Sequence, residues 1–448
     1  MNSHYKFLLF FCIFSIVYSL FFIKLSRYPI LGDGRTYYTY GINLYKGNGY
    51  SYQESPPFLQ SNLREPIYPL FICGLFKIFG ISEGVIQIWQ AILNGIMVMI
   101  TYSLANLILN DKKRALIAAI LTAVSVTIAG YAALIASETL AAVFLMLLSL
   151  LFLKLLKEKK RTKAIGLSIL TGFFCGCLVL TKMTYFLFPF LICLVLIIMP
   201  KGKFFRYIPA LCIAIISIVI LLPWLSFNNR IYGNPFFLTN RGGMAVTVKA
   251  ERLKWAPKDI IVSFIYPISE GLVQRYFPQE HKRVSYNPIE GSAFKAAYDR
   301  YDSLISQGYS EMAADKQLRV ESLKKIKANI LKYAILSISD FHFMLYFEGL
   351  PLSQFTGFFK KEVRGGINLF FKVYSLIIIF FAIKGVFIMM HYREDFFLKI
   401  VVLQPIIYTF FMYSAIFGAP RFTFTIIPFI YILASISICK MVKIKIPL

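Results

Sequence analysis

Charged residues are scarce in this sequence. Of its 448 residues, 16% are Asp, Glu, Lys or Arg, whereas 58% are hydrophobic and 17% are aromatic. The mean hydropathy is +0.66. A soluble globule of this length needs more polar surface than such a composition supplies. The composition therefore excludes a soluble protein and predicts a polytopic membrane protein.

Acidic residues are the rarer charged class, since 22 Asp and Glu stand against 48 Lys and Arg, for a net charge of +26. The basic residues fall in short clusters between apolar runs, which argues against a nucleic-acid-binding domain. Membrane topology explains them better, with anionic lipid or a phosphate-bearing ligand as the partner. The seven cysteines lie in or beside apolar stretches, so neither a disulfide framework nor a zinc site is expected.

Two nucleotide-binding motifs are missing. The sequence has no Walker A motif and no dinucleotide glycine fingerprint, so a nucleotide-driven enzyme lacks support. A signal-peptide cleavage site is missing too. The first apolar run, Phe7–Ile23, leads to Lys24 and Arg27 instead, which predicts a retained helix.

Long apolar runs are what the chain has in abundance. We expect an all-α protein with about ten transmembrane helices, each long enough to cross the ~30 Å of hydrocarbon. The short connections alternate between basic and nearly uncharged, which places both termini in the cytoplasm of a multi-pass protein of the cell membrane. The runs are Phe7–Ile23, Ile86–Leu109, Ala115–Ala133, Thr139–Leu156, Ala164–Thr181, Tyr185–Met199, Ile208–Leu225, Leu369–Met390, Phe397–Phe417 and Phe422–Met441.

Two outer segments interrupt this pattern. The first, residues 24–84, is a long loop in which Tyr68–Gly80 is too short to span and is predicted to lie at the interface. The second, a domain-like loop over residues 226–366, is mostly polar, and Glu311–Tyr333 within it has the spacing of an amphipathic helix. We therefore divide the chain into a transmembrane module (1–225), an outer region (226–366) and C-terminal helices (367–448).

Several charged residues fall on the same, outer side of this topology, and seven of them are candidate site residues. Singly, each has an ordinary explanation. Asp33, between two glycines, would shape a turn. Arg64 and Glu65 would form an exposed ion pair, and such a pair contributes roughly 0 to 1 kcal/mol to stability. A glutamate at a helix start suits the helix dipole, and cations at helix ends extend to the interface. The seven are Asp33, Arg64, Glu65, Glu138, Lys182, Arg230 and Arg421.

Together these residues suit chemistry on a lipid-linked phosphate. Guanidinium groups bind phosphate bidentately, and a carboxylate beside them can accept a proton. A metal site is less well supported. His342, near Asp340, would be a ligand together with Glu65, but a lone histidine at a membrane surface is more often an interfacial side chain. A divalent metal is compatible with the pattern, yet no ligand spacing argues for one.

Four stretches resemble one family. GDGRTYYTYGINLYKGNGYSY (Gly32–Tyr52) with LREPIYPLF (Leu63–Phe71) resembles the first outer loop of the GT-C integral-membrane glycosyltransferases. The branch is that of the dolichyl-phosphate-mannose protein mannosyltransferases and the bacterial aminoarabinose transferases. ASETL, the segment Leu222–Met244 and GAPRFTFTIIPFI (Gly418–Ile430) are similar to further segments of that branch.

This resemblance implies a polyprenyl-phosphate-linked sugar donor, an active site on the outer face and inversion at the anomeric carbon. It puts the first-loop acid on Asp33 and the loop cation and its acidic neighbour on Arg64 and Glu65. We therefore expect a cell-envelope glycosyltransferase. Asp33 would act as the general base, and some of the cations Arg64, Lys182, Arg230 and Arg421 would stabilise the leaving phosphate.

The acceptor would be a glycolipid, a polysaccharide or a protein, recognised by residues 226–366 or by a partner. Two alternatives are a flippase or transporter of lipid-linked glycans and a GT-C-type glycan ligase or polymerase. A translocation path should carry polar groups through the depth of the bundle. Here the charged residues gather at one end, which favours the enzyme.

Overall fold

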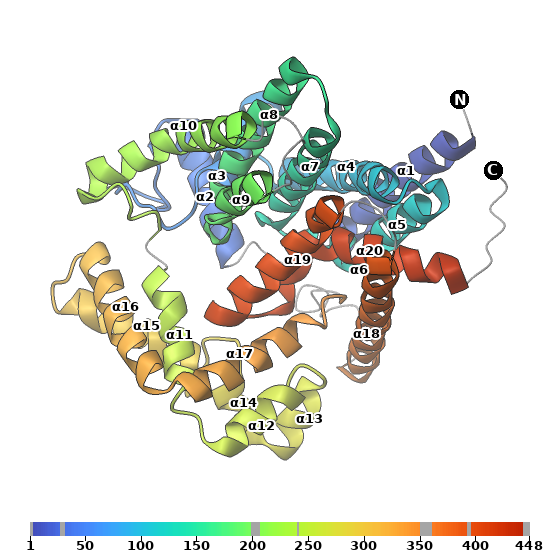
Figure 1. Ribbon diagram of the computed structural model, residues 1–448. Coiled ribbons are helices and arrows are strands. Elements are labelled where there is room, and N and C mark those ends of the chain that lie inside the picture. Colours follow the sequence, from blue (N-terminus) through green and yellow to red (C-terminus); the bar gives the residue numbers. More distant parts are fainter. Residues whose placement is uncertain are drawn as a thin grey trace.

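The fold is all-α, as predicted. The computed structural model describes residues 3–26, 32–198, 207–239, 242–349, 361–391 and 396–441, and these residues form helices and turns without a β-strand. Apolar segments become helices because a backbone in hydrocarbon must satisfy its own hydrogen bonds. Figure 1 shows the long helices gathered in one bundle, with α11 to α16 in a separate lobe beside it.

Eight described helices are long and apolar enough to cross a membrane, so the predicted number of about ten is approximate. Each of the eight corresponds to a predicted apolar run. The last of them continues from a 3₁₀ segment, η3 (Pro420–Ile426). The eight are α1 (Ser3–Leu25), α4 (Glu83–Leu109), α7 (Glu138–Lys157), α8 (Arg161–Val179), α10 (Tyr207–Tyr232), α18 (Lys361–His391), α19 (Phe396–Ile416) and α20 (Ile427–Met441).

The predicted crossing Ala115–Ala133 is instead two helices, α5 (Lys112–Val124) and α6 (Val126–Tyr131), broken at Ser125. The Ser125 side chain caps α6 and also donates a hydrogen bond of 2.6 Å to the carboxylate of Glu348. The same carboxylate accepts the backbone N–H of Thr127. Glu348 therefore satisfies backbone and side-chain groups that a continuous helix would not expose.

The described part of the predicted crossing Tyr185–Met199 is not one continuous α-helix. A 3₁₀ turn, η1 (Met183–Tyr185), leads to α9 (Phe188–Ile198), and Met199 lies outside the described residues.

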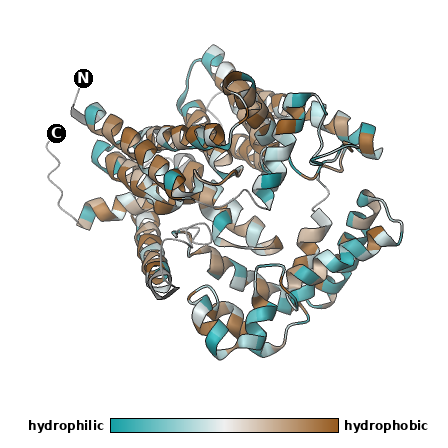
Figure 2. Ribbon diagram, turned by 180° about the vertical axis from the view of Figure 1, so that it is seen from behind, coloured by the Kyte–Doolittle hydropathy of each residue, from teal (hydrophilic) through white to brown (hydrophobic). Residues whose placement is uncertain are grey.

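The two segments that the sequence predicts to be outer, residues 24–84 and 226–366, contain helices as well. The first contains α2 (Asp33–Lys46) and α3 (Ile67–Phe79), which pack on each other. In the second, the predicted helix Glu311–Tyr333 is broken at Asn329. Figure 2 shows that the lobe formed by α11 to α16 is more hydrophilic than the bundle. The second segment comprises α11 (Gly242–Arg252), α12 (Pro257–Ile265), α13 (Glu270–Tyr276), α14 (Pro278–Val284), α15 (Ala293–Ser306), α16 (Glu311–Ala328) and α17 (Ile330–Met344).

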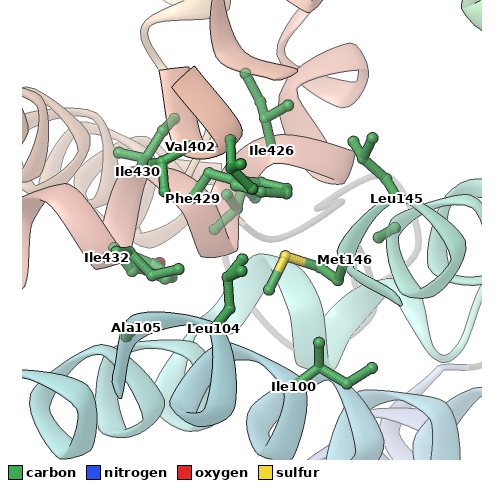
Figure 3. Packing of buried hydrophobic residues seen from close by; sticks show 14 of the residues in the cluster. Ile100, Leu104, Ala105, Leu145, Met146, Val402, Ile426, Phe429, Ile430 and Ile432 are labelled. Atoms are coloured by element: carbon green, nitrogen blue, oxygen red, sulfur yellow. The ribbon is translucent and has the colours of Figure 1, made fainter. Parts of the chain in front are cut away.

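The largest apolar core joins both ends of the chain. Leu104 of α4, Met146 of α7 and Phe429 of α20 belong to one buried cluster, together with Ile426 of η3 (Figure 3). Burying a large apolar side chain contributes about 1.5–3 kcal/mol to the stability of the folded state. This packing fixes η3, and with it Arg421, against the N-terminal half of the bundle.

Candidate active site

One cavity brings together six of the seven charged residues that the sequence singled out. Its volume is about 570 Å³. The first outer segment, the start of α7, the turn after α8, the loop after α14 and the start of η3 form its walls. The six are Asp33, Arg64, Glu65, Glu138, Lys182 and Arg421.

Asp33 is the first residue of α2, and not part of a free turn as the sequence suggested. Gly32 precedes it with φ +57°, a conformation that glycine adopts without steric cost. The Asp33 carboxylate lies between two guanidinium groups. Its Oδ1 accepts a hydrogen bond from Arg64, and its Oδ2 lies 3.1 Å from Nη2 of Arg421. Arg421 thus contacts a carboxylate that lies 388 positions earlier in the chain.

Arg64 is buried, with its guanidinium 5.0 Å from the centre of the Tyr37 ring. Burial alone would lower the pKa of Arg64, but the neighbouring Tyr37, Asp33 and Glu65 outweigh burial and raise the pKa above its ordinary value. Its backbone carbonyl accepts a hydrogen bond from the Tyr50 hydroxyl at 3.0 Å. Arg64 is therefore a fixed, permanently charged cation in the cavity wall.

A second ion pair lies beside the first. Lys182 Nζ is 3.1 Å from Oε1 of Glu138, and the two side chains are only 11% and 8% exposed. Burial would lower the pKa of Lys182, but the Glu138 charge outweighs it and raises the pKa. Nζ also lies 5.7 Å from the centre of the Phe422 ring. Lys182 is thus held inside the protein, unlike a helix-end lysine that extends to the interface.

Glu65 lies in the same wall and binds the backbone. Its Oε1 accepts a hydrogen bond of 3.2 Å from the N–H of Met183, the residue after Lys182. This bond joins the first outer segment to the turn that carries the buried lysine.

Two residues considered from sequence lie elsewhere. Arg230 is exposed near the end of α10, 6.0 Å from the Phe227 ring, and is not among the residues that line the cavity. His342 hydrogen-bonds the Tyr346 hydroxyl at 3.0 Å. Within the described residues, no group of three His, Cys, Asp or Glu side chains is arranged to hold a metal ion.

The cavity also contains residues that the sequence reading missed. Tyr37 lies one helical turn after Asp33, so recognising α2 as a helix would have found it. Asn287 and Pro288 come from the loop after α14, in the lobe formed by α11 to α16. No local pattern marks them, because only the tertiary fold brings that loop to the cavity.

Residues 63–227 match the family model of the dolichyl-phosphate-mannose-protein mannosyltransferases. A comparison with curated protein sequences gives no match. Among solved structures, the chain is similar to the oligosaccharyltransferase AglB of Archaeoglobus fulgidus in complex with an inhibitory peptide and a dolichol-phosphate. The TM-score is 0.55 and the identity 13%, over 99% of this chain and 50% of that one.

The same archaeal enzyme tethered to an acceptor peptide with the NVT sequon matches with a TM-score of 0.54 and 14% identity, over 97% of this chain and 50% of that one. ArnT of Cupriavidus metallidurans bound to undecaprenyl phosphate matches with a TM-score of 0.41 and 10% identity, over 93% of this chain and 77% of that one.

This chain spans about half the length of the archaeal oligosaccharyltransferase. At 13% identity that likeness establishes the fold, and it extends over 99% of the present chain. The mannosyltransferase family match covers Arg64, Glu65, Glu138 and Lys182 of the cavity. The chain has the fold of the GT-C superfamily of membrane glycosyltransferases.

Proposed function

We propose that the protein transfers a sugar from a polyprenyl-phosphate-linked donor to an acceptor at the outer face of the membrane. One observation carries this proposal. A single cavity holds a carboxylate between two guanidinium groups and a buried lysine, beside helices apolar enough to lie in lipid. The match to a mannosyltransferase family and the dolichol-phosphate bound by AglB support the same class of donor.

The cations would hold the donor phosphate. Arg421 suits this role best, because its side chain is 49% exposed while already next to Asp33. Arg64 and Lys182 would add fixed positive charge behind it. As the bond between the anomeric carbon and the phosphate oxygen breaks, negative charge builds up on the leaving phosphate, and preplaced cations stabilise that charge.

Asp33 would be the general base. An acceptor hydroxyl or amine would attack the anomeric carbon from the face opposite the phosphate, which inverts the configuration there, and its proton would pass to Asp33. When the donor phosphate takes up guanidinium hydrogen bonds from Arg421, an oxygen of the carboxylate is released for this step. Glu65 is the second candidate base, although its Oε1 already accepts the Met183 N–H.

In vitro transfer by the purified protein tests the proposal. We expect labelled sugar to move from a polyprenyl-phosphate donor to lipid or protein acceptors, and undecaprenyl phosphate to compete with the donor. Mass analysis of envelope glycolipids and glycoproteins from a deletion strain, against its parent, would identify sugar and acceptor. Movement of the intact donor across proteoliposomes without transfer would instead support a flippase.

Topology gives an independent prediction, because the outer-face proposal requires the cavity to open outward. In a variant lacking the seven native thiols, Ser55→Cys and Gln279→Cys should react with an impermeant thiol reagent in intact cells. Lys160→Cys should react only after lysis. All three positions are exposed on the protein, so reagent access depends on the membrane side. Labelling of Lys160→Cys in intact cells would invert the topology.

A further inference from the structure

A second cluster of buried charge lies outside the cavity. Lys249 and Arg252 of α11 both contact Asp340 of α17, with Nζ to Oδ2 at 2.6 Å and Nη1 to Oδ1 at 2.7 Å. All three side chains are at most 3% exposed. None of the three is among the cavity-lining residues, so the reaction proposed above does not use them directly.

Asp340 also organises two segments that reach the cavity. Its Oδ1 accepts a hydrogen bond of 2.9 Å from the Tyr286 hydroxyl, and the next residues along the chain, Asn287 and Pro288, line the cavity. On the other side, Lys249 donates a hydrogen bond of 3.0 Å to the carbonyl of Ser414, at the end of α19. The cluster therefore joins the outer lobe to the segment that leads to Arg421.

Gly418 packs against the backbone of Asp340. A Cβ atom added at Gly418 would lie 2.8 Å from both the carbonyl oxygen and the Cβ of Asp340. Glycine at this position thus lets the turn before η3 pack directly on α17. Arg421 follows three residues later and reaches Asp33. The position of Arg421 accordingly depends on the backbone of Asp340.

This cluster opposes folding, because three charged groups are removed from water and the single carboxylate balances only one of the two cations. Burial lowers the pKa of Lys249 to about 8, against the opposing effect of Asp340. Two Arg252 nitrogens, Nε and Nη2, have no hydrogen-bond partner within the described parts of the chain. Buried ionic groups of this kind are poor sources of stability but can enforce one specific arrangement.

We propose that Asp340, fixed by Lys249 and Arg252, is a positioning residue that places Arg421 against Asp33 through the Gly418 turn. This inference rests on the proposed function for its catalytic consequence. An error of about 1 Å in the placement of a reacting or binding group can cost roughly 10²-fold in rate. The cluster would thus act on transfer without touching donor or acceptor.

Gly418→Ala is the sharpest test. Asp340→Asn is less useful, because it leaves two buried cations without their carboxylate and so destabilises the folded protein whatever the role of Asp340. Gly418→Ala changes no charge and forces the turn away from Asp340. We expect turnover to fall about 10- to 100-fold. The melting temperature should fall as well, because the added Cβ meets the Cβ and the backbone of Asp340 rather than the flexible end of a side chain. The control is Gly271→Ala in α13, where an added Cβ meets nothing within 4 Å, and it should keep wild-type turnover.

A double-variant cycle tells a positioning role from a structural one. If Gly418 acts through Arg421, then Gly418→Ala should add little to the loss already caused by Arg421→Gln. If the double variant instead loses turnover by the product of the two single losses, the inference is overturned.

A structure of Gly418→Ala supplies a readout that needs no activity. Displacement of Arg421 from Asp33 supports the inference, and an unchanged contact overturns it. The proposed function fails separately, if the wild type neither binds undecaprenyl phosphate nor transfers sugar.

Discussion

Asp33→Asn should lower turnover by about 10² to 10⁴, the usual contribution of general-base catalysis. Asparagine has nearly the volume of aspartate and can still accept hydrogen bonds from Arg64 and Arg421, but it cannot take the acceptor's proton. Donor binding should persist or tighten, because the two guanidinium groups no longer pair with a carboxylate and are free to bind phosphate. The measurement is sugar transfer by purified protein, with undecaprenyl phosphate binding measured in parallel.

Two further variants make this result specific. Asp33→Glu should recover little activity, because one more methylene moves the carboxylate by about 1 Å. Glu54→Gln is the matched control. It removes a carboxylate that pairs with Arg35 in the same outer segment, but both side chains are more than half exposed, and exposed pairs contribute little. If Asp33→Asn kept more than about a tenth of wild-type turnover, against the 10²-fold loss of a missing base, Asp33 would be a structural residue.

Most of the fold follows from the sequence for a simple physical reason. A membrane allows only a few backbone arrangements, so long apolar runs become helices and short connections alternate between its two sides. That alternation put Asp33, Arg64, Glu138, Lys182 and Arg421 on one side. The structure adds that these residues share one cavity.

The break at Ser125 could not be predicted in this way. Residues 115–133 are apolar enough to read as one helix, and the reason they do not form one is Glu348, more than 200 residues away. A buried carboxylate that accepts a backbone N–H and a serine hydroxyl stabilises the interruption. A hydropathy average over neighbouring residues carries no information about a partner so far away in the chain.

Pairing within the site was equally hidden. The sequence treated Glu138 and Lys182 as separate helix-end residues, whereas the fold makes them one buried ion pair. This changes what a substitution at Lys182 would measure. Removing one partner of a buried pair typically costs about 3–5 kcal/mol of stability, because the other charge stays buried without compensation. The Lys182→Gln variant should therefore have a lower free energy of unfolding than the wild type, whether or not Lys182 takes part in catalysis.

Arg421 offers the cleaner test of phosphate binding. Its side chain is about half exposed, so Arg421→Gln should leave the melting temperature close to that of the wild type. If the guanidinium binds the donor phosphate, its loss removes a charge-assisted contact of about 1.5–3 kcal/mol, equal to roughly a 10- to 150-fold fall in kcat/KM for the donor. Steady-state kinetics with varied donor, and competition by undecaprenyl phosphate, would measure it.

Arg230→Gln is the control for this variant. It removes the same group from an exposed position on α10 that does not line the cavity, so its kcat/KM should change less than about twofold, as for other exposed charges. The contrast between the two variants separates local phosphate binding from the general attraction of a basic protein for an anionic lipid. Equal losses at Arg230 and Arg421 would mean that net charge alone recruits the donor. Normal kinetics in Arg421→Gln would instead assign the phosphate to Arg64 and Lys182, deeper in the cavity wall.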